Sequence, residues 1–222
     1  MEEMENYDST ATSGVYKYDV KTGRLLQRFS PEEKKQFIFG DLTLDPNGRV
    51  FVSDTKNNII FTVNEKNGKL ENYFTSDEFW NLQGITFSDD GKYLFIADYI
   101  KGNFTLDMKH KTLKHLSRNF PHTVKSVDGL TFYNNSLIAI QNMVVPMRVT
   151  RYFLNADQDV LTDLEVMDRG HPAFNEPTIG CVIDNKFYYV ANSLWSGYND
   201  KHQLKKAEEL QDVVILRADL KK

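Results

Sequence analysis

The strongest constraint on the fold is a segment of 15 to 17 residues that recurs four times along the chain, at 40–54, 83–98, 128–142 and 176–192. Each copy has two apolar runs separated by a turn rich in Asp, Asn and Gly. Short apolar runs bounded by such turn residues predict strands rather than helices. The chain is therefore expected to consist of repeated β-hairpins.

The spacing of these copies predicts the architecture. Their third residues, at Leu42, Ile85, Leu130 and Thr178, are 43, 45 and 48 residues apart. Strand-forming repeats of about 40–50 residues are typical of β-propellers, in which each repeat forms one four-stranded antiparallel blade. The four third residues are accordingly expected to occupy equivalent places on the inner strands of successive blades.

The blade pattern also predicts an open ring. A pair of outer strands at 14–30 precedes three complete blades at 40–75, 83–117 and 128–168, and a last blade at 176–220 contains a polar insertion at 196–212. We expect an all-β, single-domain propeller over 1–222, with about five modules of an incomplete six-bladed ring and a missing amino-terminal part. In an open ring, the apolar faces of Phe51 and Val52 are expected to be partly exposed.

Composition narrows the class of function. The chain is 41% hydrophobic and 26% charged, with a net charge of −4, so it lacks the excess of basic residues that nucleic-acid binding requires. No apolar stretch approaches the roughly 20 residues of a membrane helix. Cys181 is the only cysteine, which excludes an intramolecular disulfide, and its apolar strand predicts a core position. The acidic start, 1–6, is unlike a signal peptide.

Two sets of positions are expected to converge at one mouth of the central channel, because strand a begins and strand b ends on the same face of a propeller. The first set is Gly40, Gln83, Asp128 and Glu176, and the second is Asp54, Asp98, Asn142 and Asn192. All but the glycine carry carboxylates or amides, which are the oxygen ligands that Ca²⁺ and similar cations prefer. Bound metal would acidify a water, with Asp128 as the catalytic base.

A structural interpretation competes with the metal site. Asp and Asn at strand ends also cap turns by accepting backbone N–H groups, and a structural role should recur in every blade. Recurrence therefore favours capping for the second set, whereas the varied first set favours a site. The candidate metal ligands are Asp128, Gln83 and Glu176. The candidate ligand-binding residues are Gln83, Glu176, Asp41, Asn142 and Asn192.

Several stretches resemble a known family. The runs FGDLTLDPNG (39–48), LQGITFSDDGKYLFIAD (82–98), DGL (128–130) and YYVANS (188–193) are similar to the gluconolactonase/senescence-marker-protein (regucalcin) family of six-bladed propellers. Uncharacterised bacterial members share SLIAIQN (136–142) and FNEPT (174–178). The resemblance implies a lactonase with one divalent metal held by Glu, two Asn and Asp at the channel mouth.

Carried onto this sequence, the family's Asp corresponds to Asp128. Its two Asn positions correspond to Gln83 and to Gly40, which is followed by Asp41, and its Glu would lie before the first repeat. The function expected is the binding of a small polar ligand at the channel mouth, with metal-assisted hydrolysis of a lactone or ester as its enzymatic form. The alternative is a non-enzymatic scaffold for a protein or ligand. Relatives of that family often carry export signals, but the sequence does not determine the compartment of this chain.

Overall fold

The computed structural model describes residues 13–33, 35–193, 195–199 and 203–220. The described residues form eighteen strands and two short 3₁₀ turns, η1 (Trp195–Gly197) and η2 (Ala207–Glu209). The polar insertion predicted at 196–212 contains η2, and η1 begins one residue before it. Residues 200–202 of the insertion and 1–12 at the start of the chain are outside the described residues. No helix of the described part is long and apolar enough to cross a membrane.

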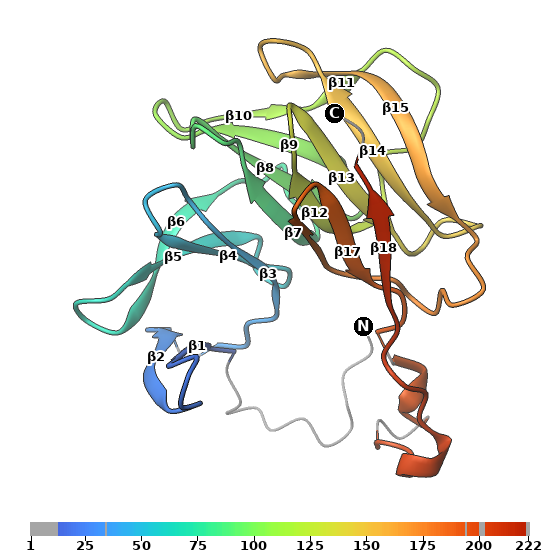
Figure 1. Ribbon diagram of the computed structural model, residues 1–222. Coiled ribbons are helices and arrows are strands. Elements are labelled where there is room, and N and C mark those ends of the chain that lie inside the picture. Colours follow the sequence, from blue (N-terminus) through green and yellow to red (C-terminus); the bar gives the residue numbers. More distant parts are fainter. Residues whose placement is uncertain (1–12, 34, 194, 200–202, 221–222) are drawn as a thin grey trace.

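The strands form four sheets that stand side by side around a common axis (Figure 1). The second sheet is a four-stranded antiparallel meander of β7 (Leu82–Phe87), β8 (Tyr93–Asp98), β9 (Gly102–Asp107) and β10 (Thr112–His115). The third contains β12 (Val127–Phe132), β13 (Ser136–Gln141), β14 (Arg148–Leu154) and β15 (Val160–Arg169), with β11 (Ser117–Arg118) pairing in parallel on β15. These sheets are propeller blades, as the repeat predicted.

The first and last sheets depart from this plan at their outer edges. In the first sheet β3 (Phe39–Leu44), β4 (Val50–Asp54), β5 (Ile59–Asn64) and β6 (Lys69–Thr75) form the blade, and the hairpin of β1 (Val15–Tyr18) and β2 (Leu25–Pro31) joins β6 through a short parallel pairing. The last sheet has β16 (Gly180–Ile183), β17 (Lys186–Val190) and β18 (Ile215–Asp219). The predicted outer half-blade is thus attached to the first sheet.

The turns fix the register of each inner hairpin. Asn134 and Asn135 have φ of 44° and 51°, and Asp184 and Asn185 have φ of 49° and 57°. Residues that tolerate positive φ are the ones such two-residue hairpin turns require. The third and last hairpins therefore have turns of equal length, and residues can be matched by counting back from them.

This count corrects one predicted equivalence. Leu130 pairs with Ala139 in the third sheet, and Gly180 pairs with Tyr189 at the corresponding place in the last. Gly180 is therefore equivalent to Leu130, and Thr178 is equivalent to Asp128. The prediction for Thr178 was wrong because the two extra residues of the last repeat precede β16 instead of lying in its hairpin.

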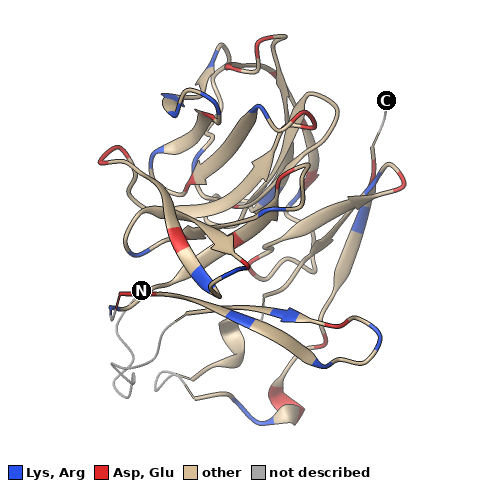
Figure 2. Ribbon diagram, turned by 90° about the vertical axis from the view of Figure 1, so that its left-hand side faces the viewer, with Lys and Arg blue, Asp and Glu red and all other residues tan. Residues whose placement is uncertain are grey.

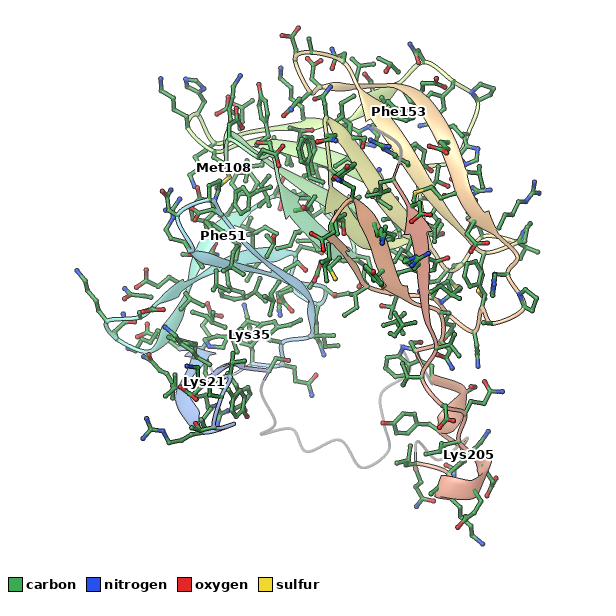
Figure 3. The ribbon with its side chains drawn as sticks, in the orientation of Figure 1. Lys21, Lys35, Phe51, Met108, Phe153 and Lys205 are labelled. Carbon is green, nitrogen blue, oxygen red and sulfur yellow. The ribbon has the colours of Figure 1, made fainter. Side chains whose placement is uncertain are left out.

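The hydrophobic core lies between neighbouring sheets. Phe51 is fully buried, and its ring meets Phe87 of the second sheet at 5.1 Å between centroids (Figure 3). Val52 is 1% exposed and belongs to a cluster with Phe29 and Phe37 on the opposite face. The prediction that Phe51 and Val52 are partly exposed is therefore wrong, because the second sheet covers Phe51 and residues before β3 cover Val52. Charges of both signs are interspersed over the molecule (Figure 2).

Candidate functional site

A cavity of about 310 Å³ lies between the inner strands β3, β7, β12 and β16. Thr43, Thr86, Thr131 and Cys181 line it from matching positions. Two of the threonines link adjacent blades: Thr86 Oγ1 accepts the Phe132 N–H at 3.0 Å, and Thr131 Oγ1 donates to the Gly180 carbonyl at 3.3 Å. The Cys181 thiol is exposed to the cavity, so its predicted core position is wrong. An apolar run without alternation does not reveal which face a residue occupies.

Asp41 lies at the edge of this cavity with its carboxylate largely buried. Its Oδ1 accepts the Leu42 N–H at 2.8 Å, and its Oδ2 accepts the Ile85 N–H of the next blade at 3.1 Å. Burial, and to a smaller extent the charge of Asp128, raise the pKa of Asp41 to about 6, although the two hydrogen bonds lower it. Asp41 therefore titrates near neutral pH, as is typical of groups in functional sites.

Asp128, the predicted base, lies at the start of β12 and is near enough to Asp41 to affect its titration. Burial raises the pKa of Asp128, and a side-chain hydrogen bond with Thr178 opposes this rise. Thr178 is the residue that matches Asp128 in the last sheet. The two predicted site residues Asp41 and Asp128 are thus half-buried carboxyl groups that lie near enough to interact electrostatically.

Glu176 and Asn142 belong to the same neighbourhood through Tyr99, a residue that the sequence did not single out. The Tyr99 hydroxyl donates to Asn142 Oδ1 at 2.5 Å. Burial, Asp128 and Glu176 raise the pKa of Tyr99 to about 12. Glu176 has a positive φ of 57°, and its Oε2 is buried without a hydrogen-bond partner in the described part of the chain.

Gln83 lies on β7, the inner strand of the second sheet, and its side chain and its backbone have different partners. Its Nε2 donates to Asn81 Oδ1 at 2.7 Å. Its carbonyl accepts the Ser53 hydroxyl at 2.7 Å, and Ser53 Oγ in turn accepts the Asp41 N–H at 2.9 Å. Ser53 thus fixes the backbone of Asp41 relative to the next blade.

The second predicted set is mostly structural. Asp54 accepts the Ile38 N–H at 2.8 Å, and buried Asp98 accepts four backbone N–H groups from 80, 81, 100 and 101. Asn192 binds the backbone at both ends of its amide, donating to the Asp212 carbonyl at 2.9 Å and accepting from Val214 at 2.8 Å. These contacts agree with the capping interpretation. Because both ends of the Asn192 amide bind the backbone, this side chain is not offered to a ligand.

Asn142 differs from the other three members of that set. Gln141, one residue earlier, takes the capping position of its blade: its Nε2 donates to the Lys125 carbonyl at 2.7 Å and the Thr123 carbonyl at 3.1 Å. The side chain of Asn142 is released to meet Tyr99. Because both residues are amides, the sequence alone could not show which of them caps the turn.

The described residues contain no group of three or more His, Cys, Asp or Glu side chains placed to hold a metal ion. The predicted ligands Asp128 and Glu176 both lie near Tyr99, but they do not complete such a group with a third acidic side chain. The residues present therefore do not fit a preformed carboxylate metal centre. What they form is a buried, acidic, hydrogen-bond-accepting rim above a polar cavity.

No protein-family model and no curated protein matches this sequence, so the resemblance to gluconolactonases remains a prediction. Solved structures of other β-propellers are similar. A chain in the crystal structure of a nidogen/laminin complex has a TM-score of 0.64 and 11% identity over 80% of this chain and 66% of its own. Virginiamycin B lyase from Staphylococcus aureus has a TM-score of 0.56 and 13% identity over 79% of this chain and 55% of its own. Kuenenia stuttgartiensis hydrazine synthase has a TM-score of 0.56 and 13% identity over 80% of this chain and 49% of its own. The chain thus spans less than two thirds of these chains, and the likeness shows the fold alone.

Proposed function

We propose that this β-propeller binds a small polar ligand at the mouth of its central channel, through Asp41, Asp128 and Glu176. The observation that carries the proposal is the proximity of buried carboxyl groups without a cationic partner. None of the ion pairs among the described residues involves any of the three. Burying a carboxylate in this way costs stability unless a hydrogen-bond donor or an opposite charge lies beside it. A ligand that supplies either one offsets this cost, and its binding is therefore favoured.

The chemistry of the site favours a ligand that donates hydrogen bonds or carries positive charge. Within the described residues Glu176 Oε2 has no hydrogen-bond donor, and Asn142 Oδ1 accepts from the Tyr99 hydroxyl. Sugar-like hydroxyl groups or an amine would supply the missing donors. A positive ligand would also lower the pKa of Asp41 toward its ordinary value, because an opposite charge nearby favours the ionised form.

A divalent cation remains a specific form of this proposal. With three acidic side chains not grouped for metal binding, such a cation would need amide oxygens from Gln83 or Asn142 and water to complete six to eight ligands. Metal-assisted hydrolysis of a lactone or ester, with Asp128 as base, depends on that cation. Ligand binding does not depend on it.

Calorimetry distinguishes the binding of a divalent cation from the binding of an organic ligand. Wild type is titrated with CaCl₂, MgCl₂, MnCl₂ and ZnCl₂, and then with gluconolactone and methylammonium chloride as probes of the two donor classes. Asp128→Asn should abolish any binding, whereas Asp77→Asn, which changes an exposed carboxyl group outside the proposed site, should leave it intact. Binding of an organic probe but no metal supports a ligand site without hydrolase chemistry. If no probe binds, or if Asp128→Asn binds equally well, the proposal fails.

A protein-binding scaffold is the second candidate, favoured by an apolar groove of about 250 Å³ on the last sheet. The groove is lined by Ile179, Tyr188, Val190 and Ile215, and Ile179 and Ile215 are each more than half exposed. Exposed contiguous apolar patches mark interaction surfaces. Ile215→Lys should then reduce self-association in light scattering or capture of a partner, without changing calorimetry at the mouth. Unchanged association in this variant would argue against the scaffold.

A further inference from the structure

One face of the third sheet carries positive charge that its own strands do not neutralise. Arg148 of β14 and Arg169 of β15 are direct partners in the antiparallel register. Side chains of such partners project from the same face, where like charges directly opposite each other destabilise a sheet. The arrangement therefore has a cost that nothing in the two strands offsets.

The acidic residues of β15 lie on the other face. Asp163, Glu165 and Asp168 pair with Phe153, Arg151 and Val149, which alternate with Arg148 along the strand sequence. Asp168, the immediate neighbour of Arg169, accepts the Tyr189 hydroxyl of the last sheet at 2.7 Å. Its carboxylate is thus committed away from the arginine pair.

A histidine covers the same face as the arginine pair. After β11 the chain turns back toward β12, and the His122 ring meets the Tyr152 ring at 6.1 Å between centroids. Tyr152 shares its face of β14 with Arg148, four residues earlier. Burial lowers the pKa of His122, and the charges of Arg148, Arg118 and Arg169 lower it further. Geometry places Arg148 beside this ring pair as well, because Arg148 Nε and the Tyr152 hydroxyl both donate to Gln141 Oε1, at 2.9 and 3.0 Å.

The arginines of this cluster have no acidic partner among the described residues. His122 Nε2 is buried without a hydrogen bond among the described residues. Arg148 Nε donates to Gln141 Oε1 at 2.9 Å, but across the described ranges none of Arg118, Arg148 and Arg169 forms an ion pair. The Arg148 and Arg169 guanidinium groups and the His122 imidazole thus share one side of the blade, and within the described part of the chain neither arginine has a carboxylate partner.

We propose that Arg148, Arg169 and His122 bind a small oxyanion, a phosphate or carboxylate group of a metabolite. The site lies on the third sheet where the start of β14 pairs with the end of β15 (Figure 1), and it shares no residue with the proposed ligand site. Arginine forks match both oxyanions in bidentate geometry, and charge-assisted hydrogen bonds are the strong ones. The bound anion removes the repulsion between Arg148 and Arg169. A doubly charged phosphate is favoured over a single carboxylate.

The test is calorimetry at low ionic strength with inorganic phosphate, acetate and citrate, each against potassium chloride of equal ionic strength. Arg148→Gln and Arg169→Gln should each weaken phosphate binding about tenfold or more, the loss expected for a hydrogen bond to a charged group. Arg24→Gln, which removes the same charge from an exposed turn, should bind as wild type does. Comparison of phosphate with acetate and citrate identifies which oxyanion the site prefers.

Thermal unfolding gives an independent readout that does not require a known ligand. Without anions, Arg169→Gln should melt above wild type, because it removes one of two opposed like charges. Phosphate should raise the melting temperature of wild type and leave that of Arg169→Gln nearly unchanged. Equal phosphate responses in Arg148→Gln, Arg169→Gln and Arg24→Gln, or no response in wild type, overturn the proposal. Binding of heparin without binding of phosphate also overturns it, in favour of a polyanionic partner.

Discussion

Replacing Asp41 by asparagine should make the protein more stable at neutral and alkaline pH. The pKa of Asp41 is about 6 in the folded chain, against 3.8 for the exposed side chain. The unfolded chain thus releases this proton near pH 3.8, while the folded chain keeps it until about pH 6. The contribution of the protonated form to stability is complete below pH 3.8, declines as the pH rises, and is lost above about pH 6.

The size of the effect follows from the same two values. Each tenfold change in proton affinity corresponds to about 1.4 kcal/mol, so ionised Asp41 destabilises the fold by about 3 kcal/mol above pH 6. Asparagine has nearly the same shape and keeps an oxygen that can accept the Ile85 or Leu42 N–H. It loses one charge-assisted hydrogen bond, worth about 1 kcal/mol or more. We therefore expect Asp41→Asn to gain about 1–2 kcal/mol at about pH 8 and nothing below about pH 4.

Urea unfolding of both proteins, followed by circular dichroism across this range of pH, measures the difference directly. Asp77→Asn serves as the control, because its exposed side chain should show no such dependence on pH. A constant difference between Asp41→Asn and wild type at all pH values would refute the reasoning. So would a loss of stability in Asp41→Asn that grows with pH, because the carboxylate would then be stabilised by its hydrogen bonds more than it is destabilised by burial.

Three further results are expected. Gly129→Ala should destabilise the fold by about 3 kcal/mol in urea unfolding, because a Cβ at Gly129 would lie 2.5 Å from the Thr178 carbonyl oxygen and the inner strands would have to move apart. Asp98→Ala should cost about 3 kcal/mol, since four backbone N–H groups lose the buried carboxylate that accepts them, whereas Asn142→Ala should cost less than about 1 kcal/mol, and similar losses in both would contradict their different roles. Cys181 should react fully with a thiol reagent in the folded protein, and protection until unfolding would contradict its place in the cavity.

The repeat was enough to predict the blades because their turns are encoded locally. Pro46-Asn47-Gly48 and the paired Asn134 and Asn135 specify where one strand stops and the next begins. The covering of Val52 by Phe29 and Phe37 depends on contacts between distant segments, which no local pattern records. The two-residue offset in the last blade could not be predicted for a related reason. The sequence at 176–177 is as compatible with the start of a strand as with the loop before it.

The sequence predicted only part of the candidate site, because carboxylates and amides at strand ends can either cap turns or bind a ligand. Asp54 and Asp98 recur with the repeat, and both cap turns in the structure. Asp128 and Glu176 vary between blades, and both lie near Tyr99. Tyr99 itself was missed because an aromatic residue after a strand is ordinary in such a chain. The signal that could have found it is its departure from the repeat, since Thr55 and Asn142 occupy the same place after their strands.

Asp41 shows why such departures mark a site. Its place on the inner strand is matched by Gly84 and Gly129, and at those two positions the backbone of the next blade comes so close that a Cβ would lie 2.5 Å from its nearest atom. In the first blade the same place holds a carboxyl group, which reaches the next blade through the Ile85 N–H. A glycine there would avoid the burial that raises the pKa of Asp41 to about 6. The chain instead keeps a destabilising group near Asp128. Packing alone does not require this cost, and the ligand binding that we propose would offset it.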